Sequence, residues 1–242
     1  MSFRIEEKLN IKKDNLFKFY EWLNLHSAEK IHPNRRISSI YFDNQNLLMY
    51  HHSVEGLIPR KKIRIRTYDD LSFIKSNLNM EKKITAAEGR FKETTIVKNL
   101  QDKITFGIFD QDYGVCKPIT KVSYDRSYFK VLNYRVTLDT NINYSLYEGL
   151  NESFRKNKDE NIIVEIKSQN TNALNDIQDK FPFQRIRFSK YCRAIDVLFF
   201  DKANPIEFTS YSNYLTFFKS KNQALSNFIS FLSISFILTN SL

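Results

Sequence analysis

Polar and apolar residues alternate along many short stretches of this chain, and alternation with a period of two indicates a β-strand with one buried face. Two stretches have helical spacing instead: residues 14–30, where Leu16, Tyr20 and Leu23 share the apolar face, and residues 172–181. Many strands with few helices predict an α+β fold. The expected strands are residues 3–11, 37–42, 61–68, 72–84, 90–97, 120–130, 134–139, 161–168 and 184–189.

The polar side of these strands is unusually basic. Because successive side chains of a strand point to opposite faces, Lys62, Arg64 and Arg66 share one face, and Ile63 and Ile65 share the other. The same alternation groups further polar side chains on common faces: Arg4, Glu6 and Lys8; Glu81 and Lys83; Arg90 and Lys92; Tyr124 and Arg126; Arg135, Thr137 and Asp139; Glu165 and Lys167; Arg185, Arg187 and Ser189.

A charged sheet face has two explanations. It is the solvated outer side of a half-buried sheet, or it lines a wet lumen. A solvated face mixes both charge signs with Ser, Thr and Gln, whereas here Arg and Lys recur at matched positions. We therefore expect a closed antiparallel β-barrel with a few flanking helices, whose basic interior focuses positive potential on a linear polyanion.

Composition also favours an anionic ligand. The 242-residue chain has a formal net charge of +10 at pH 7 and a pI near 9.4, which suits a nucleic acid, an anionic membrane surface or a phosphate-rich small molecule. Nucleic-acid binding needs exposed aromatic residues for stacking, and many of the 21 Phe and 13 Tyr lie at apolar positions instead. We expect no nucleic-acid partner.

Three carboxylates share faces with the cations and are candidate metal ligands: Glu6, Glu81 and Glu165. Mg²⁺ or Mn²⁺ binds one or two carboxylates together with phosphate oxygens. In the alternative interpretation, each glutamate neutralises a neighbouring lysine. Glu165 is the favoured ligand. The four His show no ligand spacing, and the chain has no Gly-rich phosphate loop or Ser-His-Asp arrangement.

Eight short motifs follow one another along the chain: Arg-x-Glu-x-Lys at 4–8, Ser-Ile-Tyr-Phe-Asp at 39–43, Lys-Ile-Arg-Ile-Arg at 62–66, Glu-x-Lys at 81–83, Tyr-x-Arg at 124–126, Arg-x-Thr-x-Asp at 135–139, Glu-Ile-Lys at 165–167 and Ser-Lys-Tyr at 189–191. Each motif is weak alone. In this order they resemble the VTC domain, the polyphosphate-polymerase domain of the triphosphate tunnel metalloenzymes (CYTH-like superfamily), over about residues 1–200.

The resemblance implies the triphosphate tunnel fold, ATP as phosphate donor, Mn²⁺ or Mg²⁺ as cofactor, and growth of an inorganic polyphosphate chain inside the tunnel. It implies no covalent nucleophile. Carried over by motif, the catalytic residues are Lys8, Arg64, Arg66, Lys83, Arg126, Arg135 and Lys190. The implied substrate-binding residues are Arg4, Lys62, Lys92, Tyr124, Lys167, Arg187, Ser189 and Tyr191.

The first motif departs from that of some relatives. Those that hydrolyse triphosphate or cyclise ATP usually begin with Glu-x-Glu-x-Lys, and Arg4 stands here at the first position. A cation there would weaken a second metal site and strengthen anion binding, which favours a polymerase. Two other functions stay open: a triphosphate hydrolase of the same fold, and a non-catalytic module that binds polyphosphate or inositol phosphates.

We expect a tunnel domain over residues 1–203 and an apolar tail over 204–242. The N-terminus is charged and lacks an apolar signal region, and only two Cys occur, so the expected location is the cytoplasm. No charged residue follows Lys221, although Ser residues interrupt the apolar run. Two roles stay open for the tail: a weak anchor on the cytoplasmic face of a membrane, or a helix packed on a partner.

Overall fold

The computed structural model describes residues 5–68, 78–147, 156–168, 183 and 185–200. The chain divides into two units, Met1–Leu198 and Phe199–Leu242, and only the first two residues of the second unit are described. The predicted helix at 172–181 and the predicted tail role of 204–242 lie outside the described residues. No helix in the described ranges is long and apolar enough to cross a membrane.

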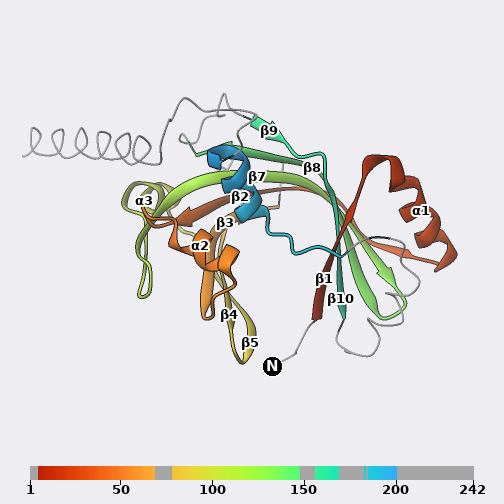
Figure 1. The fold of residues 1–242 in the computed structure, drawn as a ribbon, viewed down its shortest axis with the longest axis horizontal. Helices are drawn as coiled ribbons and strands as arrows, with labels where there is room; N and C mark the ends of the chain where they lie inside the picture. Colours follow the sequence, from red (N-terminus) through yellow and green to blue (C-terminus); the bar gives the residue numbers. More distant parts are fainter. Residues whose placement is uncertain (1–4, 69–77, 148–155, 169–182, 184, 201–242) are drawn as a thin grey trace, which may run out of the picture. The chain divides into compact units, whose positions relative to one another are not determined.

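One antiparallel sheet forms the body of the first unit, and the predicted α+β class is confirmed. Its strands pair in the order β1-β10-β8-β7-β2-β3-β4-β5, with β6 paired to β7 and β9 to β8. In Figure 1, β2, β7 and β8 are long curved strands. The strands β3, β4 and β5 lie at one end of them, and β1 and β10 lie at the other end. The bounds are β1 Ile5–Ile11, β2 Glu29–Asp43, β3 Arg60–Thr67, β4 Asn79–Ala86, β5 Gly89–Ile96, β6 Ile108–Asp110, β7 Gly114–Val131, β8 Tyr134–Leu146, β9 Lys156–Lys158 and β10 Ile162–Ser168.

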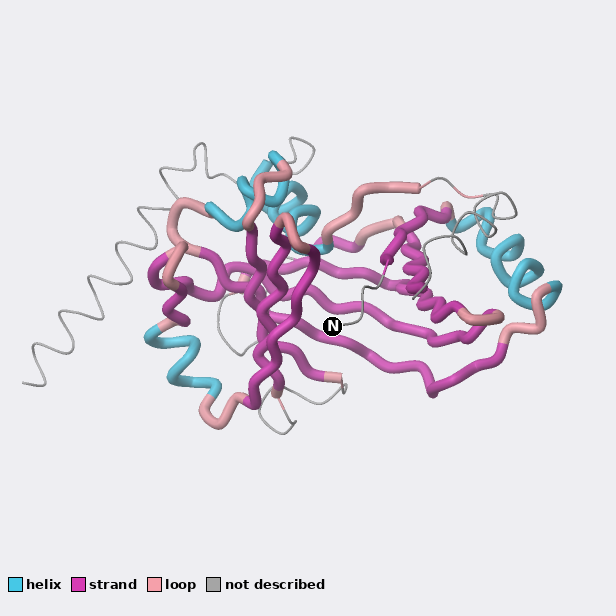
Figure 2. Tube along the Cα trace, turned by 90° about the horizontal axis from the view of Figure 1, so that it is seen from below, coloured by secondary structure: helices cyan, strands magenta, loops and turns pink. Residues whose placement is uncertain are grey.

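The sheet has the two faces that the alternation predicted. Ile63 and Ile65 are fully buried, whereas Lys62 and Arg64, which alternate with them along the strand, are partly exposed. At the other end of the sheet, an apolar cluster packs α1 (Leu16–Leu25) against the outer face, and Figures 1 and 2 show this helix apart from the others. The cluster consists of Leu9, Ile11, Phe19, Trp22, Leu23, Val131, Tyr134, Val136, Leu138, Ile162, Val164 and Ile166. The charged face of β1, β8 and β10 is therefore the one turned away from α1.

The predicted closed barrel is wrong, because the sheet is open. Its edge strands β1 and β5 do not pair with each other in the described part of the chain. Residues 185–189 instead run beside β1, where the Ile186 amide donates to the Lys8 carbonyl at 2.9 Å and a single bridge forms at Arg185. The predicted strand at 184–189 is also wrong, because its described residues form a single β-bridge and no continuous strand pairing. Alternation shows which face is charged, but it carries no information on which edges meet.

The first predicted helix exists but is shorter than residues 14–30. It consists of a 3₁₀ turn at Lys13–Asn15 followed by α1, and the chain enters β2 a few residues later. Ser27 has a φ of 48°, in the left-handed region that helices avoid. The helix therefore ends at this reversal, well before residue 30.

The buried face of α1 was predicted only in part. Leu23 is buried as expected, but Tyr20 is 44% exposed, and Phe19 and Trp22 fill the core instead. Phe17 is also exposed. Because this helix carries aromatic residues on its exposed as well as its buried side, the spacing of apolar residues alone did not identify the face that packs on the sheet.

The remaining helices were not predicted. Each has eight residues or fewer, which is too short for a clear periodic signal. Side-chain caps hold their starts: the buried Asp43 carboxylate accepts the amides of Met49 and Tyr50 at the start of α2, each at 3.0 Å, and Asn99 accepts the Asp102 amide at the start of α3, at 3.3 Å. These elements are α2 Leu48–Glu55, α3 Leu100–Phe106, α5 Lys190–Ile195 and the π-helix η2 Asp196–Phe200.

Candidate functional site

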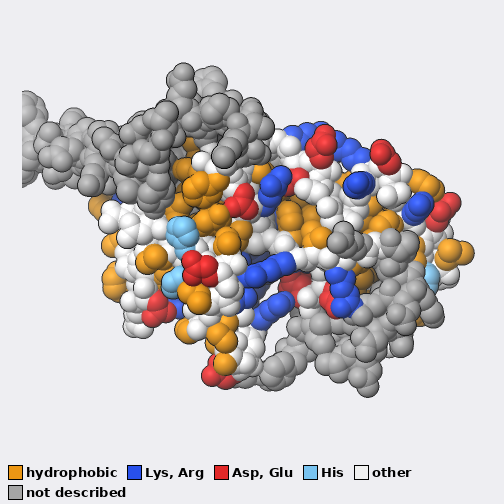
Figure 3. Space-filling model, viewed as in Figure 1, with side chains coloured by type: hydrophobic (Ala, Val, Ile, Leu, Met, Phe, Trp, Pro, Cys, Tyr) orange, Lys and Arg blue, Asp and Glu red, His pale blue; other side chains and the backbone are white. Residues whose placement is uncertain are grey.

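The charged face of the sheet borders a cavity of about 710 Å³. Fourteen cations line it against three carboxylates, so its potential is strongly positive and suits an anion. Figure 3 shows Lys and Arg side chains gathered at a hollow in the viewed face. The carboxylates are Glu6, Glu81 and Glu165, and the cations are Lys8, Arg60, Lys61, Lys62, Arg64, Arg66, Lys83, Arg90, Lys92, Arg126, Arg135, Lys167, Arg187 and Lys190.

Strand register arranges part of this lining in rows across β3, β4 and β5. Neighbouring rows are two residues apart along each strand, a spacing of about 7 Å. An extended polyanion that follows the strands would meet one row after another. From the β4–β5 turn inward, the rows are Arg60-Thr85-Arg90, Lys62-Lys83-Lys92 and Arg64-Glu81-Thr94.

The strands β1, β10 and β8 contribute a second set, in which acids and bases lie opposite one another. The cross-strand rows are Lys8-Glu165-Thr137 and Glu6-Lys167-Arg135. Lys8 also donates from Nζ to the Phe188 carbonyl at 2.8 Å, which ties β1 to residues 185–189. This segment therefore lines the cavity beside β1, at the open edge of the sheet.

Glu81 is buried among the cations of β3 and β5. Its Oε2 accepts from Arg64 Nε at 2.8 Å and Nη2 at 2.5 Å, and its Oε1 lies 3.1 Å from Lys92 Nζ. Burial alone would raise the pKa of Glu81, but the charges of Arg64 and Arg66 hold it well below its ordinary value. These contacts favour the interpretation in which Glu81 neutralises its neighbours. Its role as a metal ligand stays a prediction.

Asp139 holds two further cations in place. This fully buried carboxylate accepts from Arg126 Nε at 2.6 Å and Nη2 at 2.7 Å, and it lies 2.5 Å from Lys190 Nζ. Lys190 Nζ and Arg126 Cζ also lie 4.5 and 5.2 Å from the ring centroid of Tyr124. The Tyr124 hydroxyl in turn accepts from Arg66 at 3.1 Å. One network thus fixes three cations of the lining before any ligand arrives.

Glu165 and Glu6 are the other two predicted metal ligands, and for both of them this role stays a prediction. Both lie close to one cation, since Lys167 Nζ is 2.7 Å from Glu165 Oε1 and 3.6 Å from Glu6 Oε2. Burial alone would raise the pKa of Glu165, but Arg126 and the nearby lysines lower it, so this carboxylate is ionised. The described residues contain no cluster of three or more His, Cys, Asp or Glu that could hold a metal. A hard cation bound here would complete its coordination with phosphate oxygens and water, and the donor set fits that mode.

Two lysines of the middle row are free to bind a ligand. Within the described part of the chain, no hydrogen bond or ion pair engages the ammonium groups of Lys62 and Lys83. Burial lowers the pKa of both. For Lys83, burial and the charge of Arg64 bring the pKa to about 7. An anion placed between these lysines would relieve the desolvation and the repulsion together.

All the predicted site residues line this cavity except two. Arg4 lies outside the described residues. Tyr191 is buried, stacks on Tyr41 with a centroid distance of 5.2 Å, and donates to Asp43 Oδ2 at 2.5 Å. Its contacts support α5, while Ser189 caps the same helix by accepting the Cys192 amide at 3.3 Å. The roles predicted for the cavity residues stay predictions.

Some lining residues were missed. Tyr41 lies in the second motif, and its hydroxyl accepts from Arg64 at 3.0 Å, a contact that no sequence pattern shows. Arg60 precedes Lys62 by two positions on the same strand, so the alternation already applied to that strand could have found it. Arg90 was placed on a charged face but received no role.

The VTC domain family matches residues 3–112 and 105–199 of this chain. No curated protein matches it. Among solved structures, a "putative adenylate cyclase" from Vibrio parahaemolyticus is similar with a TM-score of 0.46 and 16% identity, covering 81% of this chain and 98% of that one. A conserved hypothetical protein from Pyrococcus furiosus follows with a TM-score of 0.42 and 15% identity, covering 73% and 85%.

Both TM-scores lie below 0.5, so neither likeness bears on function. The family match spans most of the chain and confirms the resemblance that the eight motifs carried. The activity, cofactor and partners implied by that resemblance stay predictions. This chain belongs to the VTC domain family.

Proposed function

We propose that this protein is an ATP-dependent polyphosphate polymerase, which transfers the terminal phosphate of ATP onto a growing polyphosphate chain in the basic cavity. The observation that carries the proposal is the excess of fourteen cations over three carboxylates in one cavity, arranged in successive rows along the strands. Successive rows suit a linear ligand with many phosphates better than a single compact anion. Arg supplies planar bidentate contacts to phosphate oxygens, and Lys adds point charges.

The transfer step asks the protein mainly for positioning and charge stabilisation. Arg64 and Arg126 are held by buried carboxylates, so their remaining N–H groups have fixed directions. We assign these two, with Lys190, to the oxygens of the transferring phosphate, where charge builds up. Lys62 and Lys83 have no partner in the described residues and are assigned to the acceptor chain.

A divalent cation fits beside Glu165, with Glu6 as a second carboxylate. When bound, Mn²⁺ or Mg²⁺ neutralises charge on the phosphate oxygens. Lys167 already lies between the two carboxylates. This lysine is therefore expected to shift toward a phosphate when the metal takes its place.

The test is to incubate the purified full chain with ATP and Mn²⁺ and to resolve the products by size on a gel. Long polyphosphate is the expected product, and Glu165→Gln is expected to lower its rate by about a hundredfold or more, because a charge-stabilising interaction is lost. Glu160→Gln is the matched control, since Glu160 is exposed and lies outside the cavity lining. It should leave the rate unchanged.

Two outcomes would replace the proposal by another function. Release of orthophosphate alone would make the protein a hydrolase of the same fold. Tight polyphosphate binding without turnover, and unchanged in Glu165→Gln, would make it a non-catalytic binding module.

A further inference from the structure

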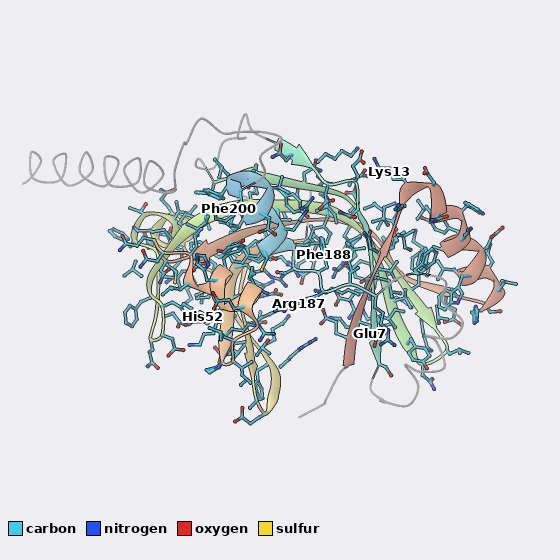
Figure 4. All side chains as sticks on the ribbon, in the orientation of Figure 1. Glu7, Lys13, His52, Arg187, Phe188 and Phe200 are labelled. Atoms are coloured by element: carbon cyan, nitrogen blue, oxygen red, sulfur yellow. The ribbon has the colours of Figure 1, made fainter. Side chains whose placement is uncertain are left out.

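Three arginines lie together where the cavity opens to solvent, and only Arg187 among them has a predicted role. Arg60 and Arg90 belong to the outermost cross-strand row, next to the β4–β5 turn. Arg187 reaches the same cavity from residues 185–189, and Figure 4 shows it between β1 and the β3–β5 strands. Arg90 and Arg187 are exposed, and Arg60 is half-buried. This group, Arg60, Arg90 and Arg187, is called the mouth cluster below.

The mouth cluster is not neutralised. Among the described residues, no carboxylate forms an ion pair with any of its three guanidinium groups. The inner cations differ, since Arg64 and Arg126 each have a buried acid as partner. Within the described residues, the mouth therefore carries three positive charges without an ion-pair partner. Burial lowers the pKa of Arg60, and the charges of Arg187 and Arg90 lower it further, which agrees with their proximity.

Backbone carbonyls at the end of α2 hold two of the three arginines, Arg60 and Arg187, in place. Arg187 Nη2 donates to the Ser53 carbonyl at 2.6 Å, and Arg60 Nη1 donates to the carbonyls of Leu57 at 2.9 Å and Gly56 at 3.3 Å. Carbonyls at a helix C-terminus carry partial negative charge, so they attract guanidinium groups. These carbonyls orient the two side chains but do not neutralise their charges, whereas a carboxylate would.

Gly56 makes room for this arrangement. Its φ is +82°, and a Cβ at this position would lie 3.3 Å from Arg187 Nη2. A larger residue would be strained by its backbone conformation and would press on the guanidinium. The local backbone is therefore suited to presenting charge at the mouth.

We propose that the mouth cluster is a separate anion subsite, which takes a phosphate group of a polyphosphate chain that extends beyond the inner rows. The inference rests on the proposed function and specifies its substrate: a chain long enough to reach the outermost row. Short phosphates that fill the inner rows do not reach it. The subsite thus makes the protein select for chain length.

The test compares tripolyphosphate with long-chain polyphosphate by calorimetric titration of the full chain without metal or ATP. Arg60→Gln/Arg90→Gln is expected to weaken long-chain binding by about tenfold for each arginine and to leave tripolyphosphate binding within about twofold. Lys98→Gln/Lys103→Gln removes the same charge from exposed positions outside the cavity lining and should leave both affinities within that range. Arg90→Gln alone, at an exposed side chain, should give the first tenfold step without affecting folding.

An equal loss for both ligands, or no loss for either, would overturn the subsite. Orthophosphate binding that disappears in the double variant, while long-chain affinity is kept, would assign the cluster to free phosphate and also overturn it. Failure of the proposed function looks different. In that case the wild-type chain makes no polyphosphate from ATP, whereas the length-dependent loss of affinity is still measured.

Discussion

Lys190 Nζ lies 2.5 Å from Asp139 Oδ2, and both side chains are largely buried. Lys190 is the first residue of α5, and Asp139 lies within β8, so this ion pair joins the helix to the sheet. Arg126 binds the same carboxylate. A single buried acid therefore sets the positions of two cations that are predicted to bind phosphate.

Replacing Asp139 by Asn should destabilise the protein. Two largely buried cations would lose their partner, and the free energy of unfolding is expected to fall by about 3 kcal/mol. Tripolyphosphate should restore part of this loss, because it supplies negative charge to the folded state only. Urea unfolding with and without the ligand measures both effects.

The control is Asp125→Asn, which removes the charge from a partly exposed pair with Arg36 at 2.9 Å. Its expected cost is below about 1 kcal/mol. Equal destabilisation by the two variants would contradict the role given to Asp139.

Lys83 should make anion binding depend on pH. Burial and the charge of Arg64 lower its pKa to about 7, against the opposing charges of Glu6 and Glu165, so the free protein loses this positive charge as pH rises through 7. Bound phosphate favours the charged form, and affinity for tripolyphosphate should therefore weaken between about pH 6 and 8. Lys83→Arg keeps the charge throughout this range and should flatten the profile. Titration calorimetry checks this, and a profile that is just as steep in Lys83→Arg would count against it.

Glu81 should contribute stability that acid removes. Its pKa is lowered in the folded protein by Arg64 and Arg66 in spite of burial, so its contribution is full above the ordinary value of 4.5 and is lost as pH falls below it. Glu81→Gln should remove this part of the pH dependence. Thermal unfolding between about pH 3 and 7 measures it. Glu88→Gln, in the exposed β4–β5 turn, is the control and should keep the wild-type dependence.

Tyr191 should act through the fold and not through the ligand. Tyr191→Phe removes the hydrogen bond to the buried Asp43, and unfolding free energy is expected to fall by about 2 kcal/mol. Affinity for tripolyphosphate should stay within about twofold where the variant is folded. A large loss of affinity with unchanged stability would return Tyr191 to the substrate-binding residues.

The alternation of side chains predicted the faces of the sheet well, because it depends only on local geometry. Ile63 and Ile65 are buried between Lys62, Arg64 and Arg66, as their positions indicate. Most of the residues that this rule grouped on charged faces line the cavity, whereas their predicted roles came from the family resemblance. It works here because one face of each strand is strongly apolar and the other is strongly basic.

Features that depend on contacts between distant segments were not predictable. Among the described residues, the edge strands β1 and β5 do not pair, and residues 185–189 lie beside β1 in place of a closing strand. Backbone carbonyls in and just after α2 hold Arg60 and Arg187, and no sequence pattern shows which carbonyls a side chain will contact. In α1, aromatic residues lie on both the exposed and the buried side, so the spacing did not show that Phe19, and not Tyr20, faces the core.

The central claim is that phosphates inside the basic cavity are joined to one another. The most direct measurement follows ATP labelled at its terminal phosphate, incubated with the full chain and Mn²⁺, and asks where the label goes. The account predicts label in polyphosphate chains that lengthen with time. Label found only in orthophosphate, or left entirely in ATP while polyphosphate binds tightly, would contradict it.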